Sequence, residues 1–255
     1  MAFRARILQE FRIDFHRFLR YAILRCDWEM RIMVAEIHPW AVSVQDAFRI
    51  QKELTRKLVL EDDSGDPEFV AGVDVAFDRK RDLLYAAVVV LDAETMELVE
   101  RVSAAQQPVF PYVPGLLTFR EGPVVLQAYE QLNHTPDLVM FDGQGIAHPR
   151  GLGLAAHIGV LLDKPSIGCA KSRLVGEFKE PKQKRGAMRT LSLHKKKVGV
   201  VLRTKDNTKP LFVSPGHRIS VETAAQRVLE AAQGYRLPEP TRLAHTEAAR
   251  AKFEG

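Results

Sequence analysis

Three hydrophobic segments of the chain each carry a carboxylate where a packed sheet would bury it. Asp74 interrupts a run of small and apolar residues, Glu121 closes a second run, and Asp142 closes a third. A carboxylate in an apolar environment costs several kcal/mol unless a partner compensates its charge. A fold that buries these runs must therefore supply a partner, and a divalent cation with oxygen ligands can serve all three acids. The pattern indicates a metal-dependent enzyme.

Positive charge is concentrated in one segment. Eleven of the 37 Lys and Arg residues lie within 179–209, where Glu180 and Asp206 are the only acids. Such a patch is typical of proteins that bind a phosphate backbone, although a solvated loop that serves solubility has the same composition. Beside a metal site, nucleic acid is the better interpretation.

Length and cysteine content limit the possible classes of protein. The 255 residues are enough for one substantial domain. The two cysteines, Cys26 and Cys169, predict no disulfide framework and fit a reducing cytoplasm. Apolar stretches of membrane-spanning length are absent from the sequence. We expect a cytoplasmic monomer without a membrane partner.

The first forty residues differ from the rest, because apolar residues recur at helix-like spacing among charges within 3–20. A transit peptide is one interpretation, and the acids of the segment count against it. An amphipathic helix that binds a partner or a membrane surface is another. A third is that translation starts at Met30 or Met33, and we favour this one.

From Ser43 onward the sequence predicts regular elements. The runs 69–77, 83–92 and 97–105 are expected to form hairpin-connected strands, and helices and strands alternate after them. This order predicts an α/β fold in which helices cover a mixed sheet. The expected division is an N-terminal extension at 1–40, a catalytic domain at 41–236 and a charged C-terminal tail at 237–255.

The acids also predict the kind of metal and reaction. Carboxylates on neighbouring strands, without a cluster of Cys or His residues, favour Mg²⁺ or Mn²⁺ over Zn²⁺. Two such ions about 4 Å apart can activate a water and stabilise the leaving oxygen of a phosphodiester. The residues alone therefore indicate a two-metal nuclease of the ribonuclease H-like type.

Seven short motifs resemble those of the endonuclease V family and follow one another in the family's order. They are Gly72-Val-Asp74, Pro111-Tyr-Val-Pro-Gly115, Phe119-Arg-Glu121, Asp142-Gly-Gln-Gly145, His148-Pro-Arg150, Ala170-Lys-Ser172 and Ser214-Pro-Gly-His217. One tripeptide of this kind has little weight, whereas seven in order are specific. The resemblance runs from about 40 to 235 and implies a ribonuclease H-like fold, a mixed β-sheet flanked by helices.

The resemblance also implies roles for individual residues. Asp74, Glu121 and Asp142 match the family's metal-binding carboxylates, with Mg²⁺ as the cofactor and Mn²⁺ as its substitute. His217 matches a further active-site residue beside the metals. Lys171 matches an active-site lysine, which can steady the scissile phosphate or the attacking water as a point charge.

Two further groups of residues match the family's contacts with its substrate. The prolines Pro111 and Pro114 would hold Tyr112 as a rigid wedge that replaces the stacking of an extruded base. The residues that match the base pocket are Gly115, Leu117, Gly143 and Gly168. Glycines let the backbone approach a base closely enough to read the 6-oxo group and N1–H of inosine. Gln144 departs from the family, since many relatives carry histidine there, and this puts substrate preference in doubt.

The resemblance thus implies a DNA-repair endonuclease. It would recognise deoxyinosine in DNA and nick the strand on the 3′ side, at the second phosphodiester bond. Two alternatives stay open: an inosine-directed endoribonuclease, and a nucleic-acid-binding relative that has lost catalysis. The 2′-hydroxyl contacts that separate RNA from DNA are not legible in the sequence.

Overall fold

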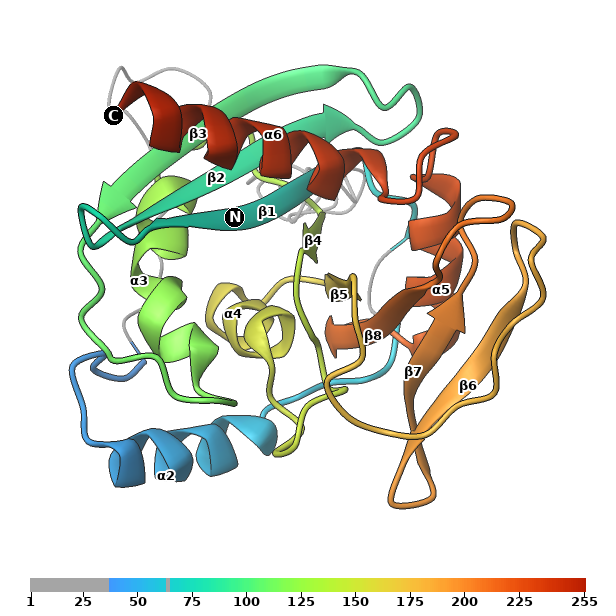
Figure 1. Cartoon of the computed structure of the whole chain (residues 1–255), viewed down its shortest axis with the longest axis horizontal. Coiled ribbons are helices and arrows are strands. Elements are labelled where there is room, and N and C mark those ends of the chain that lie inside the picture. Colours follow the sequence, from blue (N-terminus) through green and yellow to red (C-terminus); the bar gives the residue numbers. More distant parts are fainter. Residues whose placement is uncertain (1–36, 63–64) are drawn as a thin grey trace, which may run out of the picture. The chain divides into compact units, whose positions relative to one another are not determined.

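The strand-like runs of the sequence pair into one mixed sheet. The computed structural model describes residues 37–62 and 65–255, and within them eight strands follow the order β3-β2-β1-β4-β5-β8-β7-β6 (Figure 1). The strands are β1 (Phe69–Asp78), β2 (Leu83–Asp92), β3 (Leu98–Gln106), β4 (Leu138–Phe141), β5 (Ser166–Ala170), β6 (Met188–Leu193), β7 (Lys196–Leu202) and β8 (Leu211–His217). The interpretations of the N-terminal segment concern residues that lie outside the described part, apart from 37–40.

The centre of the sheet is parallel and its flanks are antiparallel. Strands β1, β4 and β5 run in one direction, while β2 and β3 extend the sheet on one side and β8, β7 and β6 on the other. The three predicted hairpin strands are confirmed to within one residue at each end. Parallel neighbours present their carboxyl ends at the same edge, and open α/β sheets hold their ligands there.

Helices cover both faces of the sheet. One core cluster joins the sheet to α3 (Leu117–Tyr129) and α4 (Leu154–Leu162), and another joins it to α5 (Val221–Glu230) and α6 (Glu239–Glu254). The helix α2 (Val44–Thr55) lies beside the loops below α3 and α4 (Figure 1). The predicted α/β architecture is confirmed. Among the helices of the described residues, none is long and apolar enough to cross a membrane.

Helix α3 begins at Leu117, whereas the sequence pattern predicts a helix over 120–132. Pro123 lies inside the helix. Leu116 and Phe119 are fully buried, so core packing sets the start of the helix. Glu121 consequently lies one turn inside α3.

The segment predicted as a charged tail is part of the domain. It folds as helix α6, which crosses strands β1 and β2 (Figure 1). A Cβ atom on Gly72 would lie 1.9 Å from the carbonyl oxygen of Pro240, so the first turn of α6 packs directly on the backbone of β1. Helix α6 therefore partly covers the small residues of β1 beside Asp74.

Candidate active site

Parallel pairing brings Asp74 and Asp142 together. Val73 on β1 is the register partner of Phe141 on β4, so the residue that follows each of them lies at the same edge of the sheet. The backbone N–H of Asp142 donates to the carbonyl oxygen of Val73 at 3.0 Å, which fixes this edge. The two carboxylates predicted from separate segments therefore share one site.

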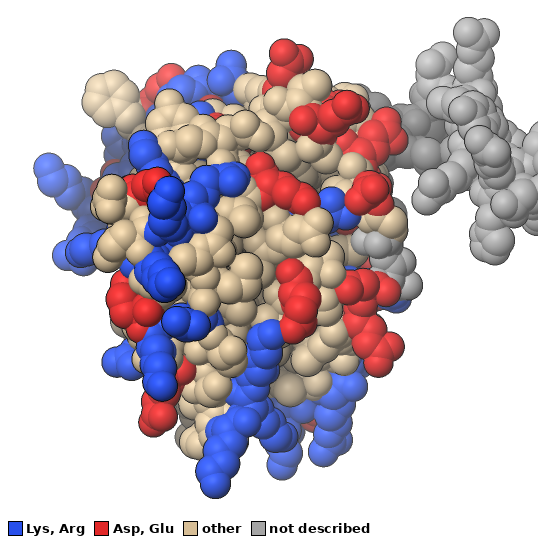
Figure 2. Space-filling model, turned by 90° about the vertical axis from the view of Figure 1, so that its right-hand side faces the viewer, with Lys and Arg blue, Asp and Glu red and all other residues tan. Residues whose placement is uncertain are grey.

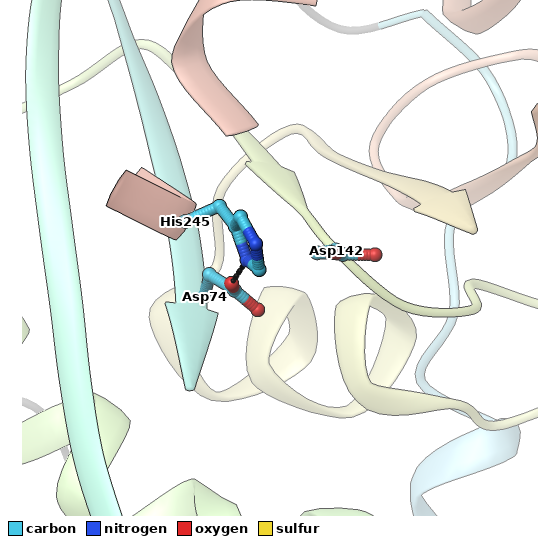
Figure 3. A group of neighbouring side chains, drawn as sticks. All are labelled: Asp74, Asp142 and His245. Atoms are coloured by element: carbon cyan, nitrogen blue, oxygen red, sulfur yellow. Dashed lines mark hydrogen bonds and ion pairs between the residues drawn. The ribbon is translucent and has the colours of Figure 1, made fainter. Parts of the chain in front are cut away.

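A histidine from the C-terminal helix joins the two aspartates. The His245 Nδ1 atom lies 2.6 Å from Oδ2 of Asp74. One ligand atom from each of Asp74, Asp142 and His245 lies within 4.8 Å of the other two, and the side chains come from β1, the end of β4 and α6 (Figure 3). Two carboxylates and one imidazole form a donor set that suits Mg²⁺ or Mn²⁺.

Glu121 approaches the same acids from α3. Its side chain is half-buried, and burial raises the pKa of Glu121 to about 8, with the charges of Asp74 and Asp142 adding to the effect and Arg120 opposing it. Burial and the neighbouring charge of Asp142 also raise the pKa of Asp74, against the hydrogen bond from His245. Like charges at short range disfavour ionisation. The negative charge of Asp74 and Glu121 is therefore incompletely balanced by the side chains around them, and a divalent cation would balance it.

Lys171 is the lysine that forms an ion pair with one of these acids. It follows β5 and pairs with Oδ2 of Asp142. The Arg236 guanidinium donates to the Lys171 carbonyl oxygen at 2.8 Å and so holds this part of the backbone in place. A flexible ammonium beside a metal-binding carboxylate can turn toward a phosphate without losing its charge.

The loop that precedes α3 presents Tyr112 to solvent. The side chain of Tyr112 is 69% exposed and lies between the exposed Pro111 and Pro114. Arg120 donates to the carbonyl oxygen of Phe110 at 3.0 Å and anchors one end of the loop. The geometry fits a rigidly held, outward-facing aromatic ring, and the wedge role stays a prediction.

The other end of this loop is anchored at Gly115, which has a φ of +77° that favours glycine. Its carbonyl oxygen accepts from Nε2 of Gln51 at 3.0 Å and from Nη2 of Arg150 at 2.5 Å. Gln51 is 1% exposed, so helix α2 fixes the loop from inside the fold.

Two of the predicted pocket glycines contact each other. A Cβ atom on Gly168 would lie 2.6 Å from the carbonyl oxygen of Gly143 and 2.3 Å from the backbone nitrogen of Gly145. Gln144, between these loop glycines, donates to the carbonyl oxygen of Ser172 at 3.1 Å, and its Oε1 atom is buried without a partner. Leu117 is the first residue of α3 and follows Gly115 by two positions. Their role as a base pocket stays a prediction.

Comparison with known proteins decides the family. The endonuclease V family model matches residues 52–246, a range that contains all three acids, Lys171 and His245. The chain belongs to the endonuclease V family.

Relatives cover nearly the whole described part of the chain. An endonuclease V from Dictyoglomus thermophilum is 49% identical over 201 residues, which are 79% of this chain and 87% of that protein. One from Methanothrix thermoacetophila is 49% identical over 209 residues, which are 82% of this chain and 92% of that protein. The match to the family makes this chain a nuclease, a hydrolase of phosphodiester bonds.

Solved structures agree. The endonuclease V of Streptomyces avermitilis superposes with a TM-score of 0.81 at 42% identity, covering 84% of this chain and 95% of that one. The Ciona intestinalis endonuclease V, solved with a DNA that contains an inosine followed by a ribo-adenosine, has a TM-score of 0.73 at 25% identity over 83% of this chain and 98% of that one. The predicted ribonuclease H-like fold is confirmed.

The structure does not bring His217 to the acids, and this corrects the expectation that it lies beside the metals. His217 ends β8 and is the register partner of Ser166, the first residue of β5. Asp142 follows Phe141 of β4, which is the register partner of Gly168, two residues further along β5. The Nε2 atom of His217 lies 3.2 Å from Oδ1 of Asp163, and its Nδ1 atom accepts from the backbone N–H of Val59 at 3.2 Å. His217 therefore joins loops at the amino end of β5, whereas the acids lie at the carboxyl ends of the parallel strands.

His245 is the site residue that sequence reasoning missed. Its segment was interpreted as a tail because it is rich in charge. A helix signal was nevertheless present, since Pro238 and Pro240 precede fifteen residues without proline and with glycine only at the end. Ala244 and Ala248, four residues apart, form the buried stripe of that helix. The signal predicts a helix but does not say which strand it covers.

Proposed function

We propose that this protein recognises deoxyinosine in DNA and nicks the strand on the 3′ side, at the second phosphodiester bond, as an initiating step of DNA repair. The observation that carries the proposal is the convergence of Asp74, Glu121 and Asp142 with His245 and Lys171 at one sheet edge. The Ciona intestinalis relative crystallised with inosine-containing DNA supports the substrate class.

We propose Mg²⁺ as the cofactor, with Mn²⁺ as its substitute. Asp74 and Asp142 would bind it, with Glu121 and His245 completing the donor set. When bound, such a cation stabilises charge on the phosphate and makes water a better nucleophile. The excess of carboxylates over neighbouring cations, visible in the raised pKa of Asp74 and Glu121, is what fits the site to a divalent ion.

The side chains of this site have distinct tasks in the proposed reaction. In the metal-free protein His245 holds Asp74 in one orientation through the 2.6 Å hydrogen bond. Lys171 supplies a mobile positive charge beside Asp142, where it can contact a phosphate oxygen. Glu121 keeps a proton at neutral pH in the metal-free protein, because its pKa of about 8 lies above 7. Binding of a cation would favour loss of that proton.

Recognition of the base would use the loop before α3. Tyr112 projects from a loop held at both ends, and stacking of its ring on the neighbouring base pair would offset the cost of extruding the lesion. Backbone groups near Gly115, Gly143 and Gly168 would read the inosine edge. The monomeric, cytoplasmic state predicted from the sequence belongs to the same proposal.

An inosine-directed endoribonuclease is the second candidate. The observation that favours it is the ribo-adenosine that follows the inosine in the DNA bound by the Ciona intestinalis relative. The 2′-hydroxyl distinguishes RNA from DNA at a given position.

The deciding experiment incubates the full chain and Mg²⁺ with an end-labelled duplex carrying one deoxyinosine. The same duplex with adenine and a matching single-inosine RNA run in parallel, and Asp142→Asn serves as the inactive control. We expect one nick, at the second phosphodiester on the 3′ side of deoxyinosine, in the inosine duplex alone. Cleavage of only the RNA would move the activity to RNA turnover. Binding without any cut, in Mg²⁺ and Mn²⁺ alike, would contradict both candidates.

A further inference from the structure

Five exposed lysines lie at the end of the sheet that carries Lys171. We call them the basic ledge, and they are Lys179, Lys182, Lys184, Lys205 and Lys209. None of the five forms an ion pair with any acid in the described part of the chain. Figure 2 shows Lys and Arg side chains gathered along the left and lower parts of the face that carries β6 and β7, with acidic side chains mostly on the opposite side.

Two loops carry the basic ledge, and backbone hydrogen bonds join them. The segment 179–187 precedes β6, and the turn 203–210 connects β7 to β8. The N–H of Asn207 donates to the carbonyl oxygen of Gln183 at 2.9 Å, and the N–H of Gly186 donates to that of Arg203 at 2.8 Å. The lysines of the basic ledge thus belong to two segments whose backbones are hydrogen-bonded to each other.

Arg203 fastens these loops from inside the fold. Its side chain is almost fully buried, and it donates to the carbonyl oxygens of Pro181 at 3.0 Å and Lys182 at 3.2 Å, and to that of Thr208. It also pairs with Glu180 at 2.8 Å. A buried guanidinium with every nitrogen hydrogen-bonded stabilises one arrangement of the loops. Glu180, one of only two acids in the segment, is thereby occupied.

The basic ledge is continuous with the active site. Arg236 donates from Nε to the carbonyl oxygen of Lys209 at 2.8 Å, and from Nη2 to that of Lys171 at 2.8 Å. Strand β8 begins directly after the turn, and Phe212 pairs with Ala170, the residue before Lys171. One side chain therefore connects the backbone of the ledge to the backbone of the lysine that pairs with Asp142.

We infer that the basic ledge binds the phosphate backbone of the nucleic acid that flanks the cleavage site, without reading its bases. The inference rests on the proposed function, because it extends the surface for that substrate. Lysines act as flexible point charges, which suit phosphates and carry no base-specific hydrogen-bond pattern. Their lack of acid partners leaves their charge available, and each phosphate they neutralise releases condensed counterions.

The chain offers a matched control at the other end of the same strand. Lys195 and Lys196 are exposed at the β6–β7 turn, and β7 has seven residues. At about 3.3 Å per residue this turn lies roughly 20 Å from the ledge. Lys205→Gln with Lys209→Gln removes two charges from the ledge, and Lys195→Gln with Lys196→Gln removes two charges away from the site.

The test measures the affinity of the full chain for a fluorescent duplex as a function of salt. Wild type and both double variants are titrated at NaCl concentrations from about 50 to about 200 mM, with Ca²⁺ in place of Mg²⁺ and gel electrophoresis to verify an uncut strand. If both ledge lysines contact phosphates, the slope of log K against log salt should fall by about 1.8, since each contact contributes about 0.9. The advantage of wild type over the ledge variant should then shrink about twelvefold across that range.

Two duplexes, one with deoxyinosine and one with adenine, separate this inference from the proposed function. We expect the same loss of slope on both, and a slope equal to wild type for the control variant. Equal slopes for all three proteins would overturn the ledge while leaving cleavage at deoxyinosine intact. If the ledge variant loses slope but wild type shows no preference for deoxyinosine, phosphate binding by the basic ledge would be supported. The proposal that deoxyinosine is the substrate would be contradicted. Unchanged thermal unfolding of the variants verifies that they fold.

Discussion

Two histidines of this protein each contact an aspartate, and the two pairs have different surroundings. His217 and Asp163 lie beside Arg218, whose guanidinium donates to both Asp163 oxygens at 2.7 and 2.9 Å. His245 and Asp74 lie beside further acids instead. The first pair has a complete set of partners for its charges. The second has an excess of negative charge.

The difference separates a structural contact from the contact that we propose to be catalytic. Around His217, every acceptor and charge has a partner within the chain, and the backbone of Val59 is held as a result. Around His245, burial and the neighbouring carboxylates raise the pKa of Asp74 and of Glu121, so the fold carries an electrostatic cost there. Such a cost is typical of a site that binds a ligand of opposite charge. A shared His–Asp geometry alone does not identify function.

The largest effect is expected for Asp142→Asn. Replacing a carboxylate that holds the cation should lower single-turnover cleavage of the inosine duplex about a thousandfold or more. Binding of the uncut duplex should stay within a fewfold of wild type, because Asp142 belongs to the proposed cation site and not to the proposed base pocket. Retained Mg²⁺-dependent cutting by this variant would remove Asp142 from the metal site.

The second test compares His245→Ala with His217→Ala in the cleavage assay. His245 orients Asp74, and loss of such a contact typically lowers activity or metal affinity about ten- to a hundredfold. His217→Ala should cleave at the wild-type rate per folded molecule, because its contacts lie at the opposite sheet edge. Equal losses in both variants would end the distinction between the two pairs.

Cation binding should stabilise the protein only through the site that contains His245 and Asp74. Mg²⁺ at about one hundred times its Kd should add about 3 kcal/mol to the free energy of unfolding, which raises Tm by roughly 5 to 10 °C. Thermal scans of Asp74→Asn should show no such rise, whereas His217→Ala should show it in full. A shift that persists in Asp74→Asn would place the bound cation elsewhere.

The pair of His217 and Asp163 should contribute to the free energy of unfolding and not to catalysis. His217 is 3% exposed, and its removal leaves the N–H of Val59 without an acceptor. We expect His217→Ala to lower the free energy of unfolding by about 2 kcal/mol in urea titrations. His245 is largely exposed, and His245→Ala should change this free energy by less than about 0.5 kcal/mol.

The pH dependence of stability should come in part from His148, which belongs to neither histidine–aspartate pair. Burial, with the charge of Arg150, lowers the pKa of His148 to about 4. The unfolded chain takes up this proton near its ordinary value of 6.5, so stability is present above that pH and is lost as pH falls toward 4. At pH 5.5 we expect a loss of about 1 kcal/mol relative to pH 7.5. His148→Asn should remove that part of the pH dependence, measured by urea titration at both pH values.

Local patterns predicted most of the fold. The hairpin strands β1 to β3 were placed to within one residue because their apolar runs end at clear turn residues. Asp74 and Asp142 were predicted to share a site because each one follows or interrupts a run that only a buried strand explains, and the structure joins them. Helix α3 starts three residues before the predicted 120, because the buried packing of Leu116 and Phe119 sets its start.

The sequence by itself indicated the acids, because strand patterns bury the runs that carry them, and its contiguous motifs indicated the lysine and the family through their resemblance to endonuclease V. Only the tertiary structure decided which histidine completes the site. His245 reaches Asp74 because α6 lies on β1, where Gly72 lets the backbone of Pro240 approach without a side chain between them. That contact joins segments far apart in the chain, and its energy comes from packing that no local pattern encodes.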